Sequence, residues 1–351
     1  MTATAAALEP FLRDLDAALP ADGFWSSPVV VGVSGGGDSM ALLLGLAGVA
    51  ARRPARPQLV VAHAEHDLRP EAAAERDTVA AVASRLGLRF VTRPIATRAP
   101  DGVRGEGLEA RARRLRYRFL EDVAHECGAR HVAIAHTADD QAETILHRAL
   151  RGTGLAGLAG MAEARQLGDG VALVRPLLGM SRAAVREWLA TGNVAWCEDA
   201  SNLDTRYARN FLRHEILDRC ASGPYPAAAA ALVRLGGQAA QASAALASAA
   251  EHVLDLHCRR EPAGGVSIDA AAVAALDQHF LGEVFAALWR REGWPRRDMT
   301  ARHYACLVAL TRAVADDAGS AADFPGPVRA TVAPHRRLVL RAAQPSISTR
   351  R

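Results

Sequence analysis

Residues Ser34–Ser39 read SGGGDS and have the types and spacing of a phosphate-binding loop. They follow the apolar run Val29–Val33 and precede the apolar run Met40–Val49, a pattern that predicts a buried strand, a tight loop and a helix. Consecutive glycines let the backbone approach a phosphate closely, and the N-terminus of the helix adds about half a positive charge. Asp38 can bind Mg²⁺, and the two serine hydroxyls can donate to phosphoryl oxygens.

This loop differs from the two commoner glycine-rich phosphate loops. The GxGxxG pattern gives no reason for an Asp-Ser pair, and the GxxxxGKS/T pattern requires a lysine. All 42 basic residues of this chain are arginine, so a lysine on the terminal phosphates is excluded. A glycine-rich turn that merely joins a strand to a helix is the alternative. The order SGGGDS after VVVGV favours the phosphate site.

A second polar cluster lies further along the chain. The segment His136–Thr144 reads HTADDQAET, follows the apolar run His131–Ala135 and opens a predicted helix. Two adjacent acids at a helix N-terminus can serve only as caps that complement the helix dipole. The functional interpretation is that Asp139 or Asp140, at the end of one strand, shares a Mg²⁺ with Asp38 at the end of another.

The elements around these clusters alternate between strand and helix. Strands are predicted at Val29–Val33, Leu59–His63, Leu88–Thr92 and His131–Ala135, and helices between them at Glu71–Leu86 and Leu108–Cys127. This alternation predicts βαβ units and a doubly wound parallel sheet, so the expected fold class is α/β. Ligands of such sheets bind at the carboxyl ends of the strands, and both clusters follow a strand. We therefore expect the two clusters to meet in space.

Length and composition set further limits. A chain of 351 residues allows two domains, and hydrophobic and charged contents of 50% and 23% are ordinary for a globular protein. No apolar run reaches the length of a membrane helix and the N-terminus does not resemble a signal peptide, so we expect a cytoplasmic protein with no membrane partner. The net charge of +4 and a pI near 9.0 permit an acidic partner such as RNA.

The second half of the chain changes character at Pro224 and Pro226, after which a very alanine-rich helix is predicted. The C-terminal domain is expected to be smaller and mainly α, with two helices before a short terminal hairpin. The domains that we expect are a catalytic domain at 1–222, a helical linker at 223–258 and a C-terminal domain at 259–351. The C-terminal helices are predicted at 269–292 and 296–315, and the hairpin strands at Val328–Val332 and Leu338–Leu340.

Three further segments carry polar residues that could contact a ligand. His63 follows the second predicted strand in the sequence HAEHDLR, where a nucleotide-contacting loop is a better interpretation than a metal site. The helix Leu108–Tyr117 places Glu109 and Arg113 on one face, which a solvated charged surface explains equally well. The basic helix Arg206–Arg213 follows an acidic loop, and its alternative interpretation is a capped surface helix with charge pairs.

In combination these stretches resemble one family, the tRNA(Ile)-lysidine synthetases of the N-type ATP pyrophosphatase (PP-loop) superfamily, over residues 29–220 and in the same order. The matching segments are SGGGDS at 34–39, HAEHDLR at 63–69, LEARARRLRY at 108–117, HTADDQAET at 136–144, RGTGLAGLAGM at 151–161, RPLL at 175–178 and EDASNLDTRYARNFLRH at 198–214. The chain departs from the family pattern at Glu65, Asp67, Thr137 and Phe211. None of these four is an expected metal or phosphate residue.

The resemblance implies a PP-loop fold and ATP-dependent attachment of free L-lysine to carbon 2 of the wobble cytidine in a tRNA(Ile) with a CAU anticodon. The base is adenylated first, and AMP and pyrophosphate are released. ATP and Mg²⁺ are the implied cofactors, with catalytic roles for Asp38, Asp139 and Arg113 and metal ligation by Asp38 and Asp139. The cofactor-binding residues that we expect are Ser34, Gly35, Gly36, Gly37, Asp38, Ser39, His63 and His136, and the tRNA-binding residues are Arg206, Arg209, Asn210 and Arg213.

The C-terminal domain is expected to contact the tRNA because it carries arginines at 259, 260, 290, 291, 296 and 297, which suit a long polyanion. Members of the family are often dimeric, which leaves a homodimer open.

Two other functions compete with this one. A tRNA thiolase on the same fold needs a cysteine relay or a cysteine-ligated cluster near the loop, and the chain has no CxxC pair and no cysteine before Cys127. A nucleotide-binding module without chemistry leaves a second acid at the site and the basic stretch Arg206–Arg213 unexplained. The five cysteines are scattered, at Cys127, Cys197, Cys220, Cys258 and Cys306.

Overall fold

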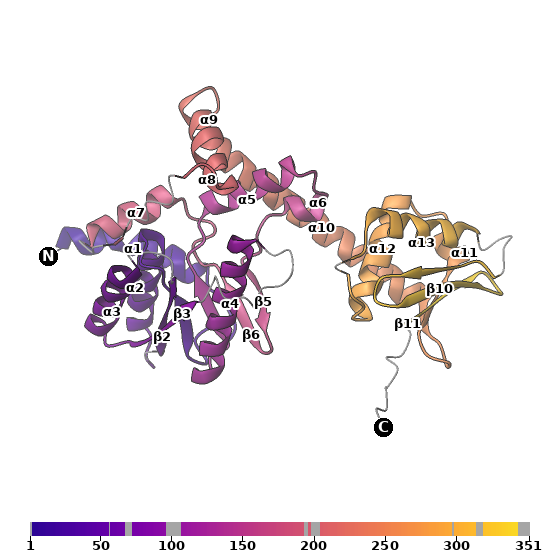
Figure 1. Cartoon of the computed structure of the whole chain (residues 1–351), viewed down its shortest axis with the longest axis horizontal. Coiled ribbons are helices and arrows are strands. Elements are labelled where there is room, and N and C mark those ends of the chain that lie inside the picture. Colours follow the sequence, from indigo (N-terminus) through magenta and orange to yellow (C-terminus); the bar gives the residue numbers. More distant parts are fainter. Residues whose placement is uncertain are drawn as a thin grey trace. The chain divides into compact units, whose positions relative to one another are not determined.

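A computed structural model of the chain describes residues 2–55, 57–66, 72–95, 107–192, 196–197, 204–296, 298–313 and 319–342. The chain divides into two compact units, Met1–Gln238 and Ala239–Arg351, and Figure 1 shows the elements of each. No helix among the described residues is both long and apolar enough to cross a lipid bilayer.

The first unit is built on a six-stranded sheet in the order β3-β2-β1-β4-β6-β5 (Figure 1). Its strands are β1 (Val29–Gly32), β2 (Leu59–His66), β3 (Arg89–Ile95), β4 (His131–Ile134), β5 (Ala164–Gly168) and β6 (Val171–Val174). Strands β1 to β4 and β6 pair in parallel, and β5 pairs with β6 in antiparallel orientation. The predicted α/β class is therefore confirmed. The sequence does not predict β5, because this strand is mostly exposed and polar and lacks an apolar run.

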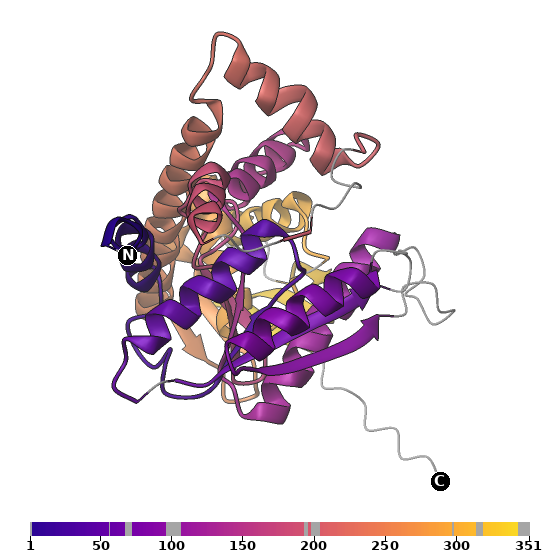
Figure 2. The same cartoon turned by 90° about the vertical axis from the view of Figure 1, so that its left-hand side faces the viewer.

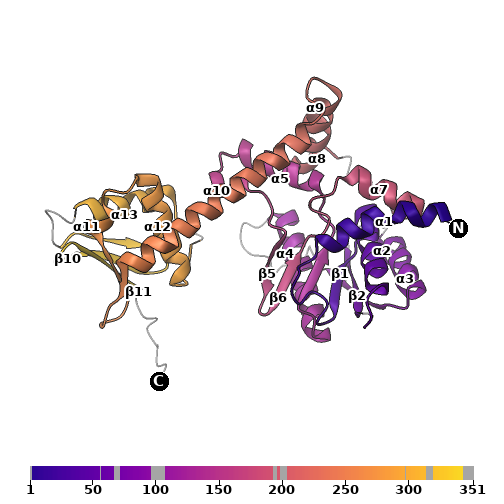
Figure 3. The same cartoon turned by 180° about the vertical axis from the view of Figure 1, so that it is seen from behind.

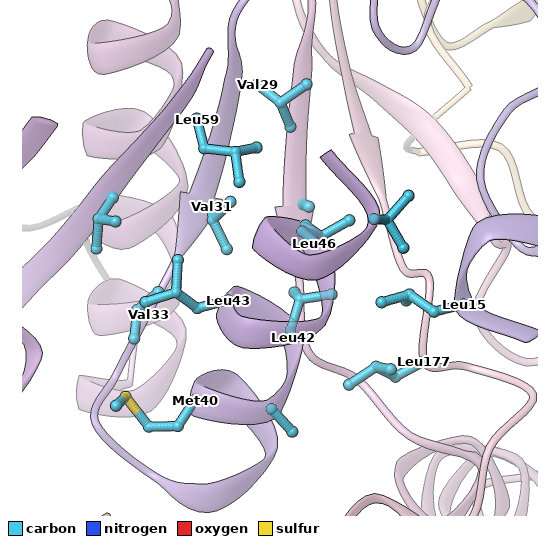
Figure 4. Close-up of a cluster of buried hydrophobic side chains, with 14 of the residues drawn as sticks. Leu15, Val29, Val31, Val33, Met40, Leu42, Leu43, Leu46, Leu59 and Leu177 are labelled. Atoms are coloured by element: carbon cyan, nitrogen blue, oxygen red, sulfur yellow. The ribbon is translucent and has the colours of Figure 1, made fainter. Parts of the chain in front are cut away.

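Helices cover both faces of this sheet. The helices of this unit are α1 (Thr2–Ala17), α2 (Gly37–Ala51), α3 (Ala72–Arg85), α4 (Leu108–Cys127), α5 (Ala138–Leu150), α6 (Leu155–Leu158), α7 (Arg182–Thr191), α8 (Ala208–Phe211) and α9 (Asp218–Ser222). Because side chains alternate along a strand, Val29 and Val31 of β1 pack with Leu46 of α2 in one cluster (Figure 4), whereas Val30 packs with Phe119 of α4 in another. The sheet is thus covered by α2 and α3 on one face and by α4 on the other, as a doubly wound fold requires.

The strand order reverses at β1. Strands β2 and β3 lie on one side of β1, and β4, which follows them in the chain, lies on the other side. Such a switch point is where ligands bind in open α/β sheets. The loop Ser34–Gly36 follows β1 and the segment Ala135–Thr137 follows β4, so the two polar clusters are placed on either side of this point.

Helix α7 joins α1 and α2 on one face of the unit (Figure 3). Ser181 caps α7 by accepting a hydrogen bond from the Ala184 N–H at 3.2 Å. Trp188 stacks on Phe11 of α1 with ring centroids 4.2 Å apart. This apolar contact fixes α7 against α1, so the start of α7 is held near the loop after β1.

A helical hairpin follows (Figure 2). Helix α8, a π-helical stretch η2 (Leu212–Leu217) and α9 lead through a turn into the long helix α10 (Ala228–His257). A Cβ at Gly236 of α10 would lie 2.5 Å from Ile145, so α10 approaches α5 closely. The glycine-rich stretch before β5 also packs on α5: Arg148 donates to the Gly157 carbonyl at 2.9 Å, and a Cβ at Gly160 would clash with Gln141 at 2.6 Å.

The second unit contains a five-stranded antiparallel sheet in the order β7-β8-β11-β10-β9 (Figure 1). Its strands are β7 (Cys258–Arg260), β8 (Val266–Asp269), β9 (Ala321–Phe324), β10 (Val328–Ala333) and β11 (Arg337–Ala342). The prediction of a mainly α domain is wrong, since the sequence indicates only the β10–β11 hairpin. The other strands have three or four residues each and bury few apolar side chains, so they carry no periodic signal.

Helices α11 (Ala270–Val273), α12 (Gln278–Arg291) and α13 (Ala301–Ala313) complete this unit. The single helix predicted over 269–292 is interrupted because Asp277 caps a new helix. Its carboxylate accepts the N–H groups of His279 at 2.8 Å and Phe280 at 3.3 Å. The unit has its own core, in which Phe285 and Trp289 of α12 are fully buried.

Candidate active site

The loop after β1 is closed by its last serine. The Ser39 hydroxyl donates to the Gly36 carbonyl at 2.8 Å and accepts the Ser34 N–H at 3.1 Å. Gly35 has φ of +95°, a backbone conformation that side-chain-bearing residues rarely adopt. Ser39 is buried and holds the loop. Ser34 is exposed as a residue, but its hydroxyl lies 3.2 Å from the Ser39 hydroxyl and accepts the Gly36 N–H at 3.4 Å.

A distant segment lies against the same loop. The Cys197 N–H donates to the Gly35 carbonyl at 3.0 Å, and the indole of Trp196 lies 3.5 Å from where a Cβ of Gly37 would stand. No cysteine lies near the loop in the sequence, but Cys197 contacts it in the structure. Distance along the chain therefore does not predict which cysteine lies at the loop. The Cys197 thiol donates to the Thr78 hydroxyl at 3.8 Å and forms no disulfide.

Four carboxylates and three guanidiniums meet at the carboxyl edge of the sheet, and we call them the acid–arginine cluster. Its members are Asp38, Asp139, Asp140, Glu143, Arg182, Arg209 and Arg213. With every member ionised, the charges −4 and +3 leave a net charge of −1. The two predicted polar clusters therefore meet in space, and three arginines from α7, α8 and η2 join them.

Asp140 and Glu143 have all their oxygens engaged. Oδ2 of Asp140 accepts the Thr137 N–H at 2.8 Å, and its Oδ1 accepts Arg182 at 2.8 Å and Arg209 at 2.9 Å. Burial opposes ionisation of Asp140, but Arg209 and Arg182 outweigh it and hold its pKa below the usual range. Glu143 is 1% exposed and accepts both Arg209 and Arg213 at 2.6 Å. Asp140 forms the capping box of α5 with Thr137, and both acids balance the arginines.

Asp38 and Asp139 each keep one oxygen that accepts no hydrogen bond from the described residues. Oδ2 of Asp38 accepts Nε of Arg182 at 3.1 Å, while its Oδ1 is buried and has no hydrogen-bond partner among the described residues. Burial raises the pKa of Asp38, although Arg182 opposes this rise. Oδ2 of Asp139 accepts the Arg182 N–H at 2.7 Å. A buried carboxylate oxygen without a donor is suited to accept a cation.

These oxygens fit the demands of Mg²⁺. This ion is usually held by one or two carboxylates, with phosphate and water oxygens completing its shell. No group of three or more His, Cys, Asp or Glu side chains is arranged for a metal within the described ranges, so a closed protein-only site is not formed there. Two aspartates beside a phosphate loop are the arrangement expected for a metal that arrives with a nucleotide.

His63 is buried and His136 is half-buried, and each is held at one ring nitrogen. Nδ1 of His63 lies 2.8 Å from the Val33 carbonyl, next to the loop, and burial lowers the pKa of His63. Nδ1 of His136 accepts Nε of Arg175 at 3.0 Å, so the ring carries its proton on Nε2. Burial and the neighbouring arginines lower the pKa of His136 to about 3. His136 is therefore a neutral hydrogen-bond donor.

Arg113 belongs to a second, purely cationic group. Its guanidinium lies 5.0 Å from the ring centroid of Tyr117, and Arg165 of β5 lies 4.9 Å from the same ring. Arg175 is 4% exposed and bonds His136. Within the described part of the chain, no carboxylate forms an ion pair with these three arginines. A cationic group of this kind favours an anion at the same edge of the sheet.

The predicted tRNA-binding residues divide into two groups. Arg206 is 89% exposed in its side chain and pairs only with the neighbouring Asp204, at 2.8 Å, among described acids. Arg209 and Arg213 instead bind the buried acids of the acid–arginine cluster, and Asn210 donates to the Asp204 carbonyl at 3.0 Å. The matching segments at 67–69 and 198–203 lie outside the described residues.

Sequence reasoning missed Arg182, Arg175 and Glu143. The signal for Glu143 was its place one turn after Asp139 on a helix whose other face is apolar, since a buried acid requires a cationic partner. Arg175 opens the RPLL segment directly after β6, at the same sheet edge as the other polar residues. Arg182 follows the cap Ser181 and has no local signal for its distant partners.

Comparison with known proteins places the chain in a family. Residues 8–220 match the family model of the PP-loop domain. The tRNA(Ile)-lysidine synthase of Methylobacterium nodulans is 42% identical over 277 residues, which cover 77% of this chain and 76% of the relative. That of Rhodopirellula baltica is 34% identical and covers 80% of this chain and 78% of its own. The Thermus thermophilus enzyme is 43% identical over 64% of this chain but 41% of its own length.

A solved structure with a similar fold is the U34-tRNA thiolase NcsA of Methanococcus maripaludis. It has a TM-score of 0.55 and 17% identity and covers 67% of this chain and 80% of its own. At this identity the likeness concerns the fold alone. The expected family is confirmed by the sequence relatives: the chain belongs to the PP-loop family and, within it, to the tRNA(Ile)-lysidine synthases.

Proposed function

We propose that this chain uses ATP to attach L-lysine to the wobble cytidine of a CAU-anticodon tRNA(Ile), through an adenylated base. The enzyme is an ATP-dependent ligase. The observation that carries the proposal is the pair Asp38 and Asp139, each with an oxygen available, in the segments that follow β1 and β4 on either side of the switch point of the sheet. A non-catalytic nucleotide module has no need for two such acids.

The first step requires a nucleophilic attack by the cytidine oxygen on the α-phosphorus, with pyrophosphate leaving. Backbone N–H groups of the loop and the Ser34 hydroxyl hold the leaving phosphates. Asp38 and Asp139 would hold Mg²⁺, which would supply positive charge to neutralise the phosphates. Arg113 offers a guanidinium to the transferred phosphate, and the Nε2–H of His136 is a neutral donor to the nucleotide. The remaining contribution is positioning.

A cavity beside Asp139 suits the second substrate. It has a volume of about 350 Å³ and lies between α5, α7 and the helical hairpin. Arg186 supplies a cation for a carboxylate, Asp218 an anion for an ammonium group, and Leu217 an apolar wall for an aliphatic stem. We propose that lysine binds here, next to the acid that holds the metal. The adenylated oxygen is then a good leaving group when the lysine amine attacks carbon 2.

The lysine site predicts a selective kinetic effect. Arg186→Gln should raise the KM for lysine by about 10- to 100-fold, because a charge-assisted hydrogen bond contributes about 1.5–3 kcal/mol. The affinity for ATP should stay unchanged, since the phosphate loop lies outside this cavity. An unchanged KM for lysine, measured by incorporation of labelled lysine into tRNA, would place the substrate elsewhere.

For the tRNA we propose contacts by Arg206, which is exposed, and by the C-terminal unit. Three of the arginines that suggested the second contact already bind acids within that unit: Arg260 with Glu292 at 2.7 Å, and Arg290 and Arg291 with Glu251. The proposal there rests on exposed arginines such as Arg259 and Arg296. Each substitution that removes an arginine–phosphate pair should reduce the salt dependence of tRNA binding by about one unit of slope. A homodimer is a further proposal that sedimentation of the full chain would test.

One experiment tests the function as a whole. The purified protein is given ATP, Mg²⁺, tRNA(Ile) transcript and labelled lysine, and one component is omitted at a time. Continued release of AMP and pyrophosphate, with label in the tRNA, should require all four. Sulfur transfer to the tRNA in place of lysine would instead support a thiolase, and hydrolysis of ATP without any change to the tRNA would contradict both enzymes.

A further inference from the structure

Arg182 contacts both predicted metal ligands, and through different groups. Its Nε donates to Oδ2 of Asp38 at 3.1 Å, and its backbone N–H donates to Oδ2 of Asp139 at 2.7 Å. The chain separates Arg182 from Asp38 by 144 positions and from Asp139 by 43. One residue at the start of α7 therefore links the loop after β1 to the loop after β4.

The contact with Asp139 follows from the place of Arg182 in its helix. Arg182 is the first residue of α7, after the cap Ser181, so its N–H has no acceptor within the helix and bonds outside it. This backbone contact survives any substitution that keeps an amide proton. The contact with Asp38 depends on the guanidinium, so a side-chain variant changes one ligand and leaves the other in place.

Each aspartate keeps its second oxygen. Oδ1 of Asp38 is buried and without a hydrogen-bond partner, and among the described residues no group donates to Oδ1 of Asp139. The Arg182 side chain is 15% exposed and is fixed further by Asp140, which accepts its Nη2 at 2.8 Å. A guanidinium held in this way can orient the Asp38 carboxylate so that Oδ2 is bound to Arg182 and Oδ1 is left for a cation.

We propose that Arg182 is a positioning residue for the metal: it orients Asp38 and so presents Oδ1 of that carboxylate to the ion. The inference rests on the proposed metal role of Asp38 and Asp139. The chain contains no lysine, so the presence of arginine instead of lysine at this position says nothing about its role. The proposal rests on the contacts that Arg182 makes. Groups that orient metal ligands are typically worth about 10- to 100-fold in metal affinity.

If Arg182 only neutralised the carboxylates, its removal would change the metal affinity in the opposite direction. A guanidinium that merely neutralised the carboxylates would compete with the cation, and its removal would tighten metal binding. The experiment measures binding of Mn²⁺ to the full-length protein without tRNA, with and without ATP, through the electron paramagnetic resonance signal of free Mn²⁺. The variants are Arg182→Gln, Arg182→Lys and the control Arg148→Gln, which removes a contact with the Gly157 and Gly160 carbonyls and none with an acid.

Arg182→Gln should weaken Mn²⁺ binding by about 10- to 100-fold, Arg182→Lys by less, and Arg148→Gln should keep wild-type affinity. Turnover of Arg182→Gln should recover when Mg²⁺ is raised, whereas a variant that lacks the Asp38 carboxylate should not recover. Unchanged or tighter Mn²⁺ binding by Arg182→Gln overturns the inference alone. Absence of Mn²⁺ binding by the wild type, even with ATP, overturns the metal role itself and the inference with it. If circular dichroism shows that Arg182→Gln is unfolded, wild-type affinity in Arg182→Lys has the same overturning force.

Discussion

Both units of this chain contain pairs of arginine with acidic side chains, but those at Glu143 in the first unit form on a buried acid, whereas those at Arg291 in the second are partly exposed. In the first unit Glu143 is 1% exposed and binds Arg209 and Arg213 at the edge of the sheet. In the second unit Arg291, whose side chain is 31% exposed, binds Glu251 at 2.8 Å. Burying a charge costs several kcal/mol that only good partners offset, whereas exposed pairs contribute about 0–1 kcal/mol. A buried cluster with this cost indicates that its charges serve a purpose, and here the cluster includes Asp38 of the phosphate loop.

The largest expected difference between the units concerns catalysis. Asp38→Asn keeps the shape of the side chain and removes the charge that would hold Mg²⁺, so tRNA-dependent pyrophosphate release should fall by about 10²- to 10³-fold. Stability should not fall, because burial raises the pKa of Asp38 and the fold therefore disfavours its charged form.

The matched control is Asp323→Asn, which removes an acid that is 73% exposed and paired with Arg329 in the second unit. This variant should turn over like the wild type in the pyrophosphate assay. Near-normal turnover of Asp38→Asn would remove the metal role, and equal losses in both variants would erase the distinction between the units.

The next effect is on stability. Glu143→Gln leaves Arg209 and Arg213 without the carboxylate that both contact at 2.6 Å. Breaking a buried ion pair costs about 3–5 kcal/mol, and we expect the low end because Arg209 keeps Asp140 as a partner. Urea denaturation followed by circular dichroism measures the free energy of unfolding. A loss below about 1 kcal/mol would show that this cluster behaves like the surface pairs.

The contrast between the units also bears on what the sequence can predict. Strands β1 to β4 and the SGGGDS loop are local patterns, and each could be found from a few consecutive residues. The contact of Arg182 with Asp38 joins residues 144 positions apart, and that of Cys197 with Gly35 joins a loop to a segment beyond α7, so neither leaves a local trace. In the second unit, β7, β8 and β9 are too short to show a periodic apolar pattern. Strand β8 pairs with β11, which is distant in the chain, whereas β7 and β9 pair with their chain neighbours β8 and β10.

The pH dependence of stability distinguishes the buried site in a third way. His136 has a folded pKa of about 3, below the value of 6.5 expected in the unfolded chain. Between these values the unfolded state binds the extra proton, so stability rises with pH through this window and is lost as pH falls. Below pH 6.5 the loss attributable to His136 should approach about 1.4 kcal/mol per pH unit.

His136→Asn should remove this contribution, so the unfolding free energies of wild type and variant should converge as pH falls from 7 to 5. The control is His252→Asn, at an exposed position of α10. If the unfolding free energies of wild type and His136→Asn differed by the same amount at every pH from 7 to 5, His136 would not be held neutral by the fold.

The smallest expected effect lies in the second unit. Arg291→Gln removes contacts with Glu251 and Asp255, both within hydrogen-bond distance but partly exposed to water. Because water screens these charges, the loss of unfolding free energy should stay below about 1 kcal/mol and should shrink further in 1 M salt, where the Debye length is about 3 Å. A double-mutant cycle with Glu251→Gln should give a coupling of about 0.2–1 kcal/mol. A salt-insensitive coupling above 2 kcal/mol would mean that exposure does not separate the two sets of ion pairs, and the cost of burial would then no longer single out the acid–arginine cluster.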